Sequence, residues 1–155
     1  MAVIKFFASG AYLGYSPLAS GTLGTLWGIP LYFWLSRYSP GVQGGIIVLL
    51  ILAAVYAAGR AARIWGQKDP SRVVADEIVG YLVSVCWIPL TWFSVIGGFF
   101  IFRLMDIIKP FPIRKIDQEM PGGWGIVLDD VLAGIYTNIL LRVILWLGFY
   151  NVLKD

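Results

Sequence analysis

The side chains that could do chemistry in this sequence are mainly carboxylates, and they are unevenly placed along it. Eight of the nine acidic residues fall in or beside two stretches, residues 60–77 and 103–130, and only Asp155 lies elsewhere. The chain has no histidine, and its one cysteine, Cys86, is not part of a Cys-x5-Arg phosphate loop. Histidine-based phosphatases, Ser-His-Asp hydrolases and histidine-ligated zinc enzymes are therefore excluded.

Two acidic pairs share a spacing that would bring them together. Asp76-Glu77 and Asp129-Asp130 each open an apolar stretch, and a glycine follows each pair one helical turn later. Residues four apart share a helix face, so each glycine lets a second helix approach beside an acid. Acidic pairs held together repel unless a divalent cation lies between them, and oxygen ligands favour a hard ion such as Mg²⁺. Either pair alone is explained equally well by the helix dipole, which stabilises acids at a helix N-terminus.

Asp106 lies between two cations at helical spacing. Arg103 and Lys109 are each three residues away from it, so the three side chains can share one helix face. A carboxylate that binds a metal, beside cations that bind phosphate oxygens, suits a phosphate ester as substrate. A salt-bridge ladder at a helix end is the alternative interpretation. Other loop charges are interpreted as solvated surface groups, among them Asp117, Glu119, Arg60 and Arg63.

Two glycine-bearing segments, residues 16–25 and 122–125, are expected to lead into helices. Backbone N–H groups at a helix start can bind an anion, and a hydroxyl such as that of Thr22 adds a donor. Each segment alone is weak support, because glycine often serves only to let the chain turn. Neither segment matches the P-loop pattern.

The composition predicts an integral membrane protein of one domain. Hydrophobic residues make up 59% of the 155 residues and charged residues 14%, against about 45–50% and about 25% in ordinary globular chains. A soluble domain of this size has too little interior to bury so much apolar surface. The start of the chain lacks the pattern of a cleavable signal peptide. The net charge of +3 is not gathered into a face for nucleic acid.

Four apolar stretches are candidates for crossing a bilayer, which requires about 17–25 residues of helix. They are residues 23–35, 44–62, the stretch between Glu77 and Arg103, and residues 131–150. The third stretch fits either one long span or a hairpin with its turn near Pro89. Loops rich in Lys and Arg tend to be cytoplasmic. The two such loops, residues 60–77 and 103–130, lie on the same side of the bilayer only if the stretch between them forms the hairpin. We therefore expect an all-α, polytopic bundle of about five helices, with the N-terminus cytoplasmic and the C-terminus outside, although Lys154 is a weak counter-signal.

Four segments, in this order, resemble the phosphatidylglycerophosphatase A family over about residues 10 to 136. They are Gly21-Thr22-Leu-Gly24-Thr25, Asp69-Pro-Ser71-x-x-Val74-x-Asp76-Glu77-x-x-Gly80, Phe102-Arg103-x-x-Asp106-x-x-Lys109-Pro110-x-Pro112-Ile113-Arg114 and Gly122-Gly-x-Gly125-Ile-x-x-Asp129-Asp130-x-x-Ala133-Gly134. The order of four motifs makes the resemblance much more specific than any one of them.

The resemblance implies an all-helical, Mg²⁺-dependent phosphatase of the inner membrane, with its site on the cytoplasmic face. It would convert phosphatidylglycerophosphate, a membrane lipid, to phosphatidylglycerol and phosphate in phospholipid biosynthesis. The expected catalytic carboxylates are Asp69, Asp76, Glu77, Asp129 and Asp130. The expected metal ligands are Asp76, Glu77, Asp106, Asp129 and Asp130. The expected substrate contacts are Thr22, Thr25, Arg103, Lys109 and Arg114.

The sequence departs from the family pattern at three positions and leaves two rival functions open. Ser20 stands where the family commonly has Pro, Ala75 where it often has Trp, and Pro70 where some members have His. The last departure argues against an essential histidine. A CDP-alcohol phosphotransferase also uses aspartates and Mg²⁺, but its Asp-x-x-Asp-Gly signature is not found. A small ion transporter would place acids within its spans, whereas here the acids lie at span ends and the only charge well inside a predicted span is Arg142.

Overall fold

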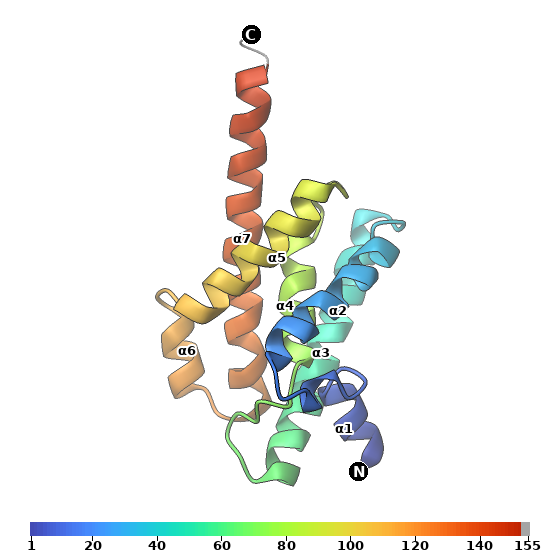
Figure 1. Ribbon diagram of the computed structural model, residues 1–155, viewed down its shortest axis with the longest axis vertical. Helices are drawn as coiled ribbons and strands as arrows, with labels where there is room; N and C mark the ends of the chain where they lie inside the picture. The colour runs from blue at the N-terminus through green and yellow to red at the C-terminus, as the bar shows by residue number, and fades with distance from the viewer. Residues whose placement is uncertain (153–155) are drawn as a thin grey trace.

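The computed structural model describes the backbone of residues 1–152 and the side chains of residues 1–148. Over this part of the chain the protein is all-helical, with seven α-helices, one 3-10 turn and no strand (Figure 1). The elements are α1 (Ala2–Ala8), η1 (Leu13–Tyr15), α2 (Ser20–Leu35), α3 (Pro40–Trp65), α4 (Ala75–Val85), α5 (Trp92–Ile108), α6 (Ile113–Glu119) and α7 (Gly122–Val152). The predicted all-α fold class is confirmed.

Helix α4 is the centre of the bundle and packs against α2, α3, α5 and α7. Its side chains Tyr81, Leu82 and Val85 are buried together with Phe102 of α5. Helix α7 is the longest element, and its C-terminal part projects beyond the other helices (Figure 1). Because α4 is short and enclosed, the acids in its first turn are held at a fixed position relative to α5 and α7.

Local signals in the sequence account for several helix ends. Pro40 occupies the first turn of α3, where its missing N–H costs nothing, and Gly66 ends that helix with a left-handed φ of 65°. Helix α5 begins with a reciprocal capping box between Thr91 and Ser94. The chain turns between α4 and α5 around Pro89, as expected, but neither helix is among those found long and apolar enough to cross a bilayer, so two crossings at this point stay a prediction.

The protein is a membrane protein. Helix α3 and the Gly122–Gly148 part of α7 are long and apolar enough to cross a bilayer, and the 26 residues of α3 rise about 39 Å. Large apolar side chains such as Leu49, at 67% exposure, and Phe100, at 66%, point away from the bundle. Lipid is the solvent in which such side chains are stable without a protein partner.

The expected count of about five helices is wrong, because α1 and α6 are additional. Each has seven residues, too few to register as a membrane span. The predicted Leu23 start also differs from the structure, in which α2 begins at Ser20. The predicted C-terminal position, with Lys154, lies outside the described residues.

The expectation that Asp129-Asp130 opens a helix is also wrong, because α7 begins at Gly122 and the pair lies two turns inside it. Gly122–Gly125 is therefore part of the helix rather than a segment leading into it. A Cβ on Gly123 would overlap the carbonyl oxygen of Val55 in α3. The glycines at this point permit close helix packing, which a sequence pattern alone does not distinguish from a turn.

Candidate active site

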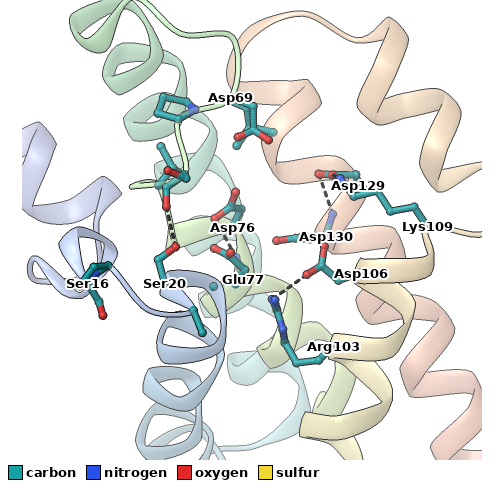
Figure 2. A pocket seen from close by; sticks show the side chains of 17 residues that line it. Ser16, Ser20, Asp69, Asp76, Glu77, Arg103, Asp106, Lys109, Asp129 and Asp130 are labelled. Carbon is teal, nitrogen blue, oxygen red and sulfur yellow. Dashed lines mark hydrogen bonds and ion pairs between the residues drawn. The ribbon is translucent and has the colours of Figure 1, made fainter.

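A cavity of about 530 Å³ lies where α2, α4, α5 and α7 meet. Six carboxylates line it, against two cationic side chains (Figure 2). The acids are Asp69, Asp76, Glu77, Asp106, Asp129 and Asp130, and the cations are Arg103 and Lys109. The structure therefore brings together eight of the side chains that the sequence marked. The excess of negative charge makes the cavity attractive to cations.

The two acidic pairs use the same local geometry. The Oδ1 atom of Asp76 accepts the backbone N–H of Glu77 at 3.0 Å, and Oδ1 of Asp129 accepts the N–H of Asp130 at 3.0 Å. The first acid of each pair is thus fixed by its own backbone. The second acid is left to project into the space between the helices, as Figure 2 shows.

Close packing of α4 on α7 places the two pairs side by side. A Cβ on Gly80 would lie 2.8 Å from the carbonyl oxygen of Asp130, and 2.7 Å from the ring of Phe102. A Cβ on Gly134 would overlap the carbonyl oxygen of Gly80. The expectation that these glycines allow the acid-bearing helices to approach closely is confirmed.

Three carboxylates form a group that fits a divalent cation. One ligand oxygen each from Asp76, Glu77 and Asp130 lies within 4.8 Å of the other two. Asp76 and Asp130 are only 7% and 4% exposed. The buried Oε2 atom of Glu77 has no hydrogen-bond partner among the described residues. An all-oxygen set with an unsatisfied buried oxygen matches the ligand preference of Mg²⁺.

The two other acids expected as metal ligands are ion-paired to cations. Asp106 Oδ2 lies 2.7 Å from Nη1 of Arg103, and Asp129 Oδ2 lies 2.7 Å from Nζ of Lys109. Nη1 of Arg103 is buried, and its contact with Asp106 does not have hydrogen-bond geometry. Both cations therefore stand at the edge of the three-carboxylate group, where they can meet a negatively charged ligand.

Lys109 lies at the end of α5, in a left-handed conformation with φ 46°. Burial alone would lower the pKa of its ammonium, but the hydrogen bond and negative charge of Asp129 outweigh burial and raise it. Lys109 is therefore a permanent cation in the cavity.

Asp69 comes from the loop between α3 and α4. Burial raises the pKa of its carboxyl above the ordinary value, while the positive charge of Lys109 opposes that shift. A carboxylate with a raised pKa at the edge of a cation-binding cavity is suited to accept a proton.

Three expected substrate contacts do not line the cavity. The hydroxyl of buried Thr25 donates to the carbonyl oxygen of Gly21 in its own helix at 2.9 Å. Thr22 lies in α2 and is partly buried, and Arg114 is exposed on α6. Their roles stay predictions.

The sequence interpretation did not single out the three serines that line the cavity together with the acids. Ser16, Ser20 and Ser71 line the cavity, and the hydroxyl of Ser20 donates to the carbonyl oxygen of Ser71 at 2.8 Å. Ser20 directly precedes the Gly21 motif, and Ser71 lies within the Asp69 motif. These positions were the signal from which the two serines could have been predicted to line the site. Asp117, which was interpreted as a solvated charge, instead contacts Lys109 at 3.1 Å.

Comparisons with known proteins find a family model and relatives that match most of the chain. The family model described as phosphatidylglycerophosphatase A matches residues 6–145. A Bacteroides thetaiotaomicron protein named putative phosphatidylinositol-3-phosphatase is 41% identical over 142 residues, covering 86% of this chain and 87% of the relative. The phosphatidylglycerophosphatase A of Escherichia coli is 37% identical over 124 residues, covering 79% and 72%. That of Haemophilus influenzae is 36% identical over 143 residues, covering 91% and 88%. No solved structure matches the chain.

Proposed function

The chain belongs to the phosphatidylglycerophosphatase A family, and from this premise we propose how it acts as a phosphatidylglycerophosphate phosphatase. In this proposal Asp76, Glu77 and Asp130 hold Mg²⁺, and the enzyme releases the terminal phosphate of phosphatidylglycerophosphate. The family membership that the motifs predicted is confirmed. It also favours hydrolysis over the phosphotransferase and transporter alternatives.

The observation that carries the Mg²⁺ proposal is the buried three-carboxylate group with the unpartnered Oε2 of Glu77. Three acids within 4.8 Å of one another repel strongly at low dielectric. A divalent cation would remove that repulsion and satisfy the orphaned oxygen. When bound, Mg²⁺ supplies Lewis-acid stabilisation of the phosphoryl oxygens and a more acidic bound water.

The cationic side chains are assigned to the phosphate. Arg103 and Lys109 face the cavity from the last turns of α5, next to the three-carboxylate group. Each can donate to a non-bridging phosphate oxygen, and their charges offset the charge that develops during transfer. Arg114 and Thr22 are retained as substrate contacts outside the cavity, whereas the buried Thr25 would have to give up its hydrogen bond to Gly21 to reach a substrate.

Asp69 is assigned as the proton acceptor. A water oxygen forms the new bond to phosphorus, the bond from phosphorus to the glycerol oxygen breaks, and the departing oxygen gains the proton that Asp69 took from the water. Asp69 lies at the cavity edge and has a raised pKa, so it can take the proton that the attacking water loses. Asp129 holds Lys109 in place during this step.

We place the protein across the inner membrane as a multi-pass protein with the cavity at the cytoplasmic side. The basic residues of the loops around the cavity support this orientation through the positive-inside rule. The acids lie at one end of the α4–α5 hairpin, and its turn lies at the other. A lipid phosphate at headgroup depth would then meet the carboxylates while its acyl chains remain in the bilayer.

Phosphate release from phosphatidylglycerophosphate by the protein purified in detergent tests the proposal. We expect activity with Mg²⁺, loss of activity in EDTA, and recovery when Mg²⁺ is restored. Asp130→Asn should lower kcat at least about 100-fold, because it removes one of three charged ligands. Glu119→Gln, which changes an exposed acid outside the cavity, is the matched control. Full activity in EDTA would refute the metal assignment.

A second lipid substrate is favoured by one relative. The Bacteroides thetaiotaomicron protein that matches 86% of this chain is named for phosphatidylinositol 3-phosphate. That lipid presents the same phosphate monoester on a bulkier alcohol. Comparing kcat/KM for the two lipids under identical detergent conditions decides between them, and a preference for the inositol lipid would overturn our assignment.

A further inference from the structure

Lys109 is held by two carboxylates from different helices. Its Nζ lies 2.7 Å from Oδ2 of Asp129 in α7 and 3.1 Å from Oδ1 of Asp117 in α6. Asp129 belongs to the cavity wall, whereas Asp117 approaches Lys109 from outside that wall. The three side chains are 24%, 6% and 33% exposed in the order Lys109, Asp129 and Asp117. This is a partly buried triad, which solvent screens less than a surface pair.

Helix α6, which carries Asp117, is fixed at both ends. Nζ of Lys68 donates to the carbonyl oxygens of Asp117 at 3.4 Å and Gln118 at 3.0 Å, near the C-terminus of α6. A cation at that end of a helix also interacts favourably with the helix dipole. Just before α6, the carbonyl oxygen of Phe111 accepts the hydroxyl of Tyr136 at 3.0 Å. The carboxylate of Asp117 therefore reaches Lys109 from a braced element.

An ammonium group has three hydrogens to donate. Asp129 accepts one of them from Nζ at 2.7 Å, and Asp117 restrains the ammonium further through the ion pair at 3.1 Å. Lys109 also lines the cavity, so an N–H that Asp129 does not take can meet a ligand there.

We propose that Asp117 is a positioning residue, which holds the ammonium of Lys109 so that an N–H points at a phosphate oxygen of the substrate. This inference rests on the phosphatase function proposed above. Without Asp117 the ammonium is held by Asp129 alone and can rotate about that single contact. Lys109 then pairs one-to-one with Asp129, and its charge is drawn away from the phosphate.

A double-mutant cycle on turnover tests the proposal. Asp117→Asn in the otherwise native protein should lower kcat about 10-fold, within the range typical of residues that orient a functional group. The same change in a Lys109→Met background should have no further effect, because the group that Asp117 positions is gone. Asp117→Glu, which keeps the charge, should retain more activity than Asp117→Asn.

Binding of inorganic phosphate in the presence of Mg²⁺, measured by calorimetry, gives a second cycle that needs no turnover. Asp117→Asn should weaken phosphate binding when Lys109 is present and leave it unchanged when Lys109 is Met. The matched control is Glu119→Gln on the same helix. Glu119 forms only an exposed contact with Lys115 at 3.9 Å, with side chains 65% and 60% exposed, so both readouts should stay at the native level. Thermal unfolding in detergent verifies that each variant is folded.

The outcomes separate this inference from the proposed function. Additive effects of the two substitutions on kcat, that is, an undiminished effect of Asp117→Asn in the Lys109→Met background, would overturn the positioning role while the phosphatase function stands. A non-additive phosphate-binding cycle, in a protein that does not hydrolyse phosphatidylglycerophosphate, would support the positioning role and refute the substrate. A native protein with neither turnover nor phosphate binding would refute both.

Discussion

Gly134 of α7 lies against the backbone of Gly80 in α4, so closely that a Cβ on Gly134 would overlap the carbonyl oxygen of Gly80. Each glycine is one helical turn from an acid of the three-carboxylate group. The contact therefore sets the distance between the ligands from α4 and the ligand from α7. The packing of α4 on α7 and the geometry of the three-carboxylate group therefore depend on the same contact.

Gly134→Ala should impair both stability and activity. The added methyl group meets backbone as well as Val83, so the helices must separate, and overpacking of this kind costs about 1–3 kcal/mol. Separation also moves Asp130 away from Asp76 and Glu77. We expect a lower unfolding temperature in detergent and a loss of phosphate release.

Gly148→Ala is the matched control for that substitution. Gly148 lies on the same helix and has no atom within 4 Å of a Cβ at its position. Alanine there should leave activity unchanged and slightly favour the helix. If Gly134→Ala behaved like Gly148→Ala, the close crossing of α4 and α7 would be disproved.

Gly21→Ala should reduce turnover with little loss of stability. A Cβ at Gly21 would overlap Oε1 of Glu77 and lie 3.0 Å from Nη1 of Arg103. The methyl group would displace the tip of a metal ligand and of a phosphate-binding cation, and a misplacement of about 1 Å can cost about 100-fold in rate. Steady-state kcat measures the effect.

Gly41→Ala is the comparison for Gly21→Ala, because no atom lies within 4 Å of a Cβ at Gly41. It should keep native kcat. Native kcat in Gly21→Ala as well would mean that Glu77 or Arg103 is not needed where the structure places it.

The carboxylate cluster was predictable from sequence because its spacing reflects helix geometry. An acid and a glycine one turn apart mark a helix face that is both charged and closely packed, and Asp76 with Gly80 illustrates this. The positions of Arg103 and Asp106 followed from the same periodicity. The composition and the length of the apolar stretches likewise predicted a helical membrane protein.

The rest depended on contacts between distant parts of the chain. Asp117 looks like an ordinary loop acid until α6 folds back onto the end of α5 and brings it to Lys109. Arg142 looks like an isolated charge in an apolar helix, yet its Nη2 donates to the carbonyl oxygen of Cys86 at 3.2 Å. The starts of α2 and α7 were predicted too late in the chain, because glycines that permit close packing have the same sequence signature as glycines that form turns.

Asn138→Leu should destabilise the fold while leaving the chemistry largely intact. The side-chain amide of Asn138 donates to the carbonyl oxygens of Val83, Ser84 and Cys86 at 2.9–3.1 Å, and so satisfies the C-terminal end of α4. Without Asn138 the carbonyl oxygen of Cys86 keeps Arg142 and that of Val83 keeps the N–H of Cys86, but that of Ser84 loses its side-chain donor. Leaving such a carbonyl unpaired costs about 1–3 kcal/mol. Asn138 is two turns from Asp130, so kcat of the folded fraction should change little.

Thermal unfolding and phosphate release measured on the same Asn138→Leu preparation separate these two effects. Ile139→Leu is the control, because Ile139 is the next residue and its side chain is exposed. An unfolding temperature equal to that of Ile139→Leu would show that water or lipid satisfies the end of α4 without Asn138.

Asp130→Asn should have opposite effects on stability with and without Mg²⁺. In EDTA, at a pH high enough to ionise Asp76, Glu77 and Asp130, the three carboxylates repel one another by roughly 3 kcal/mol per charged pair at an effective dielectric constant of 20. Removing one charge relieves two of the three repulsive pairs, so the variant should unfold at a higher temperature than the native protein.

With Mg²⁺ at about 100 times its dissociation constant, the native protein should gain about 2.7 kcal/mol. The variant has lost a charged ligand and should gain much less, so the order of the two unfolding temperatures should reverse. Unfolding curves in EDTA and over a Mg²⁺ titration, with Ca²⁺ as a second ion and Glu119→Gln as a control that follows the native protein, measure this reversal. If Mg²⁺ raised the unfolding temperature of Asp130→Asn and of the native protein by the same amount, the cation would bind elsewhere, because losing a ligand at the true site lowers Mg²⁺ affinity and so lowers the stabilisation.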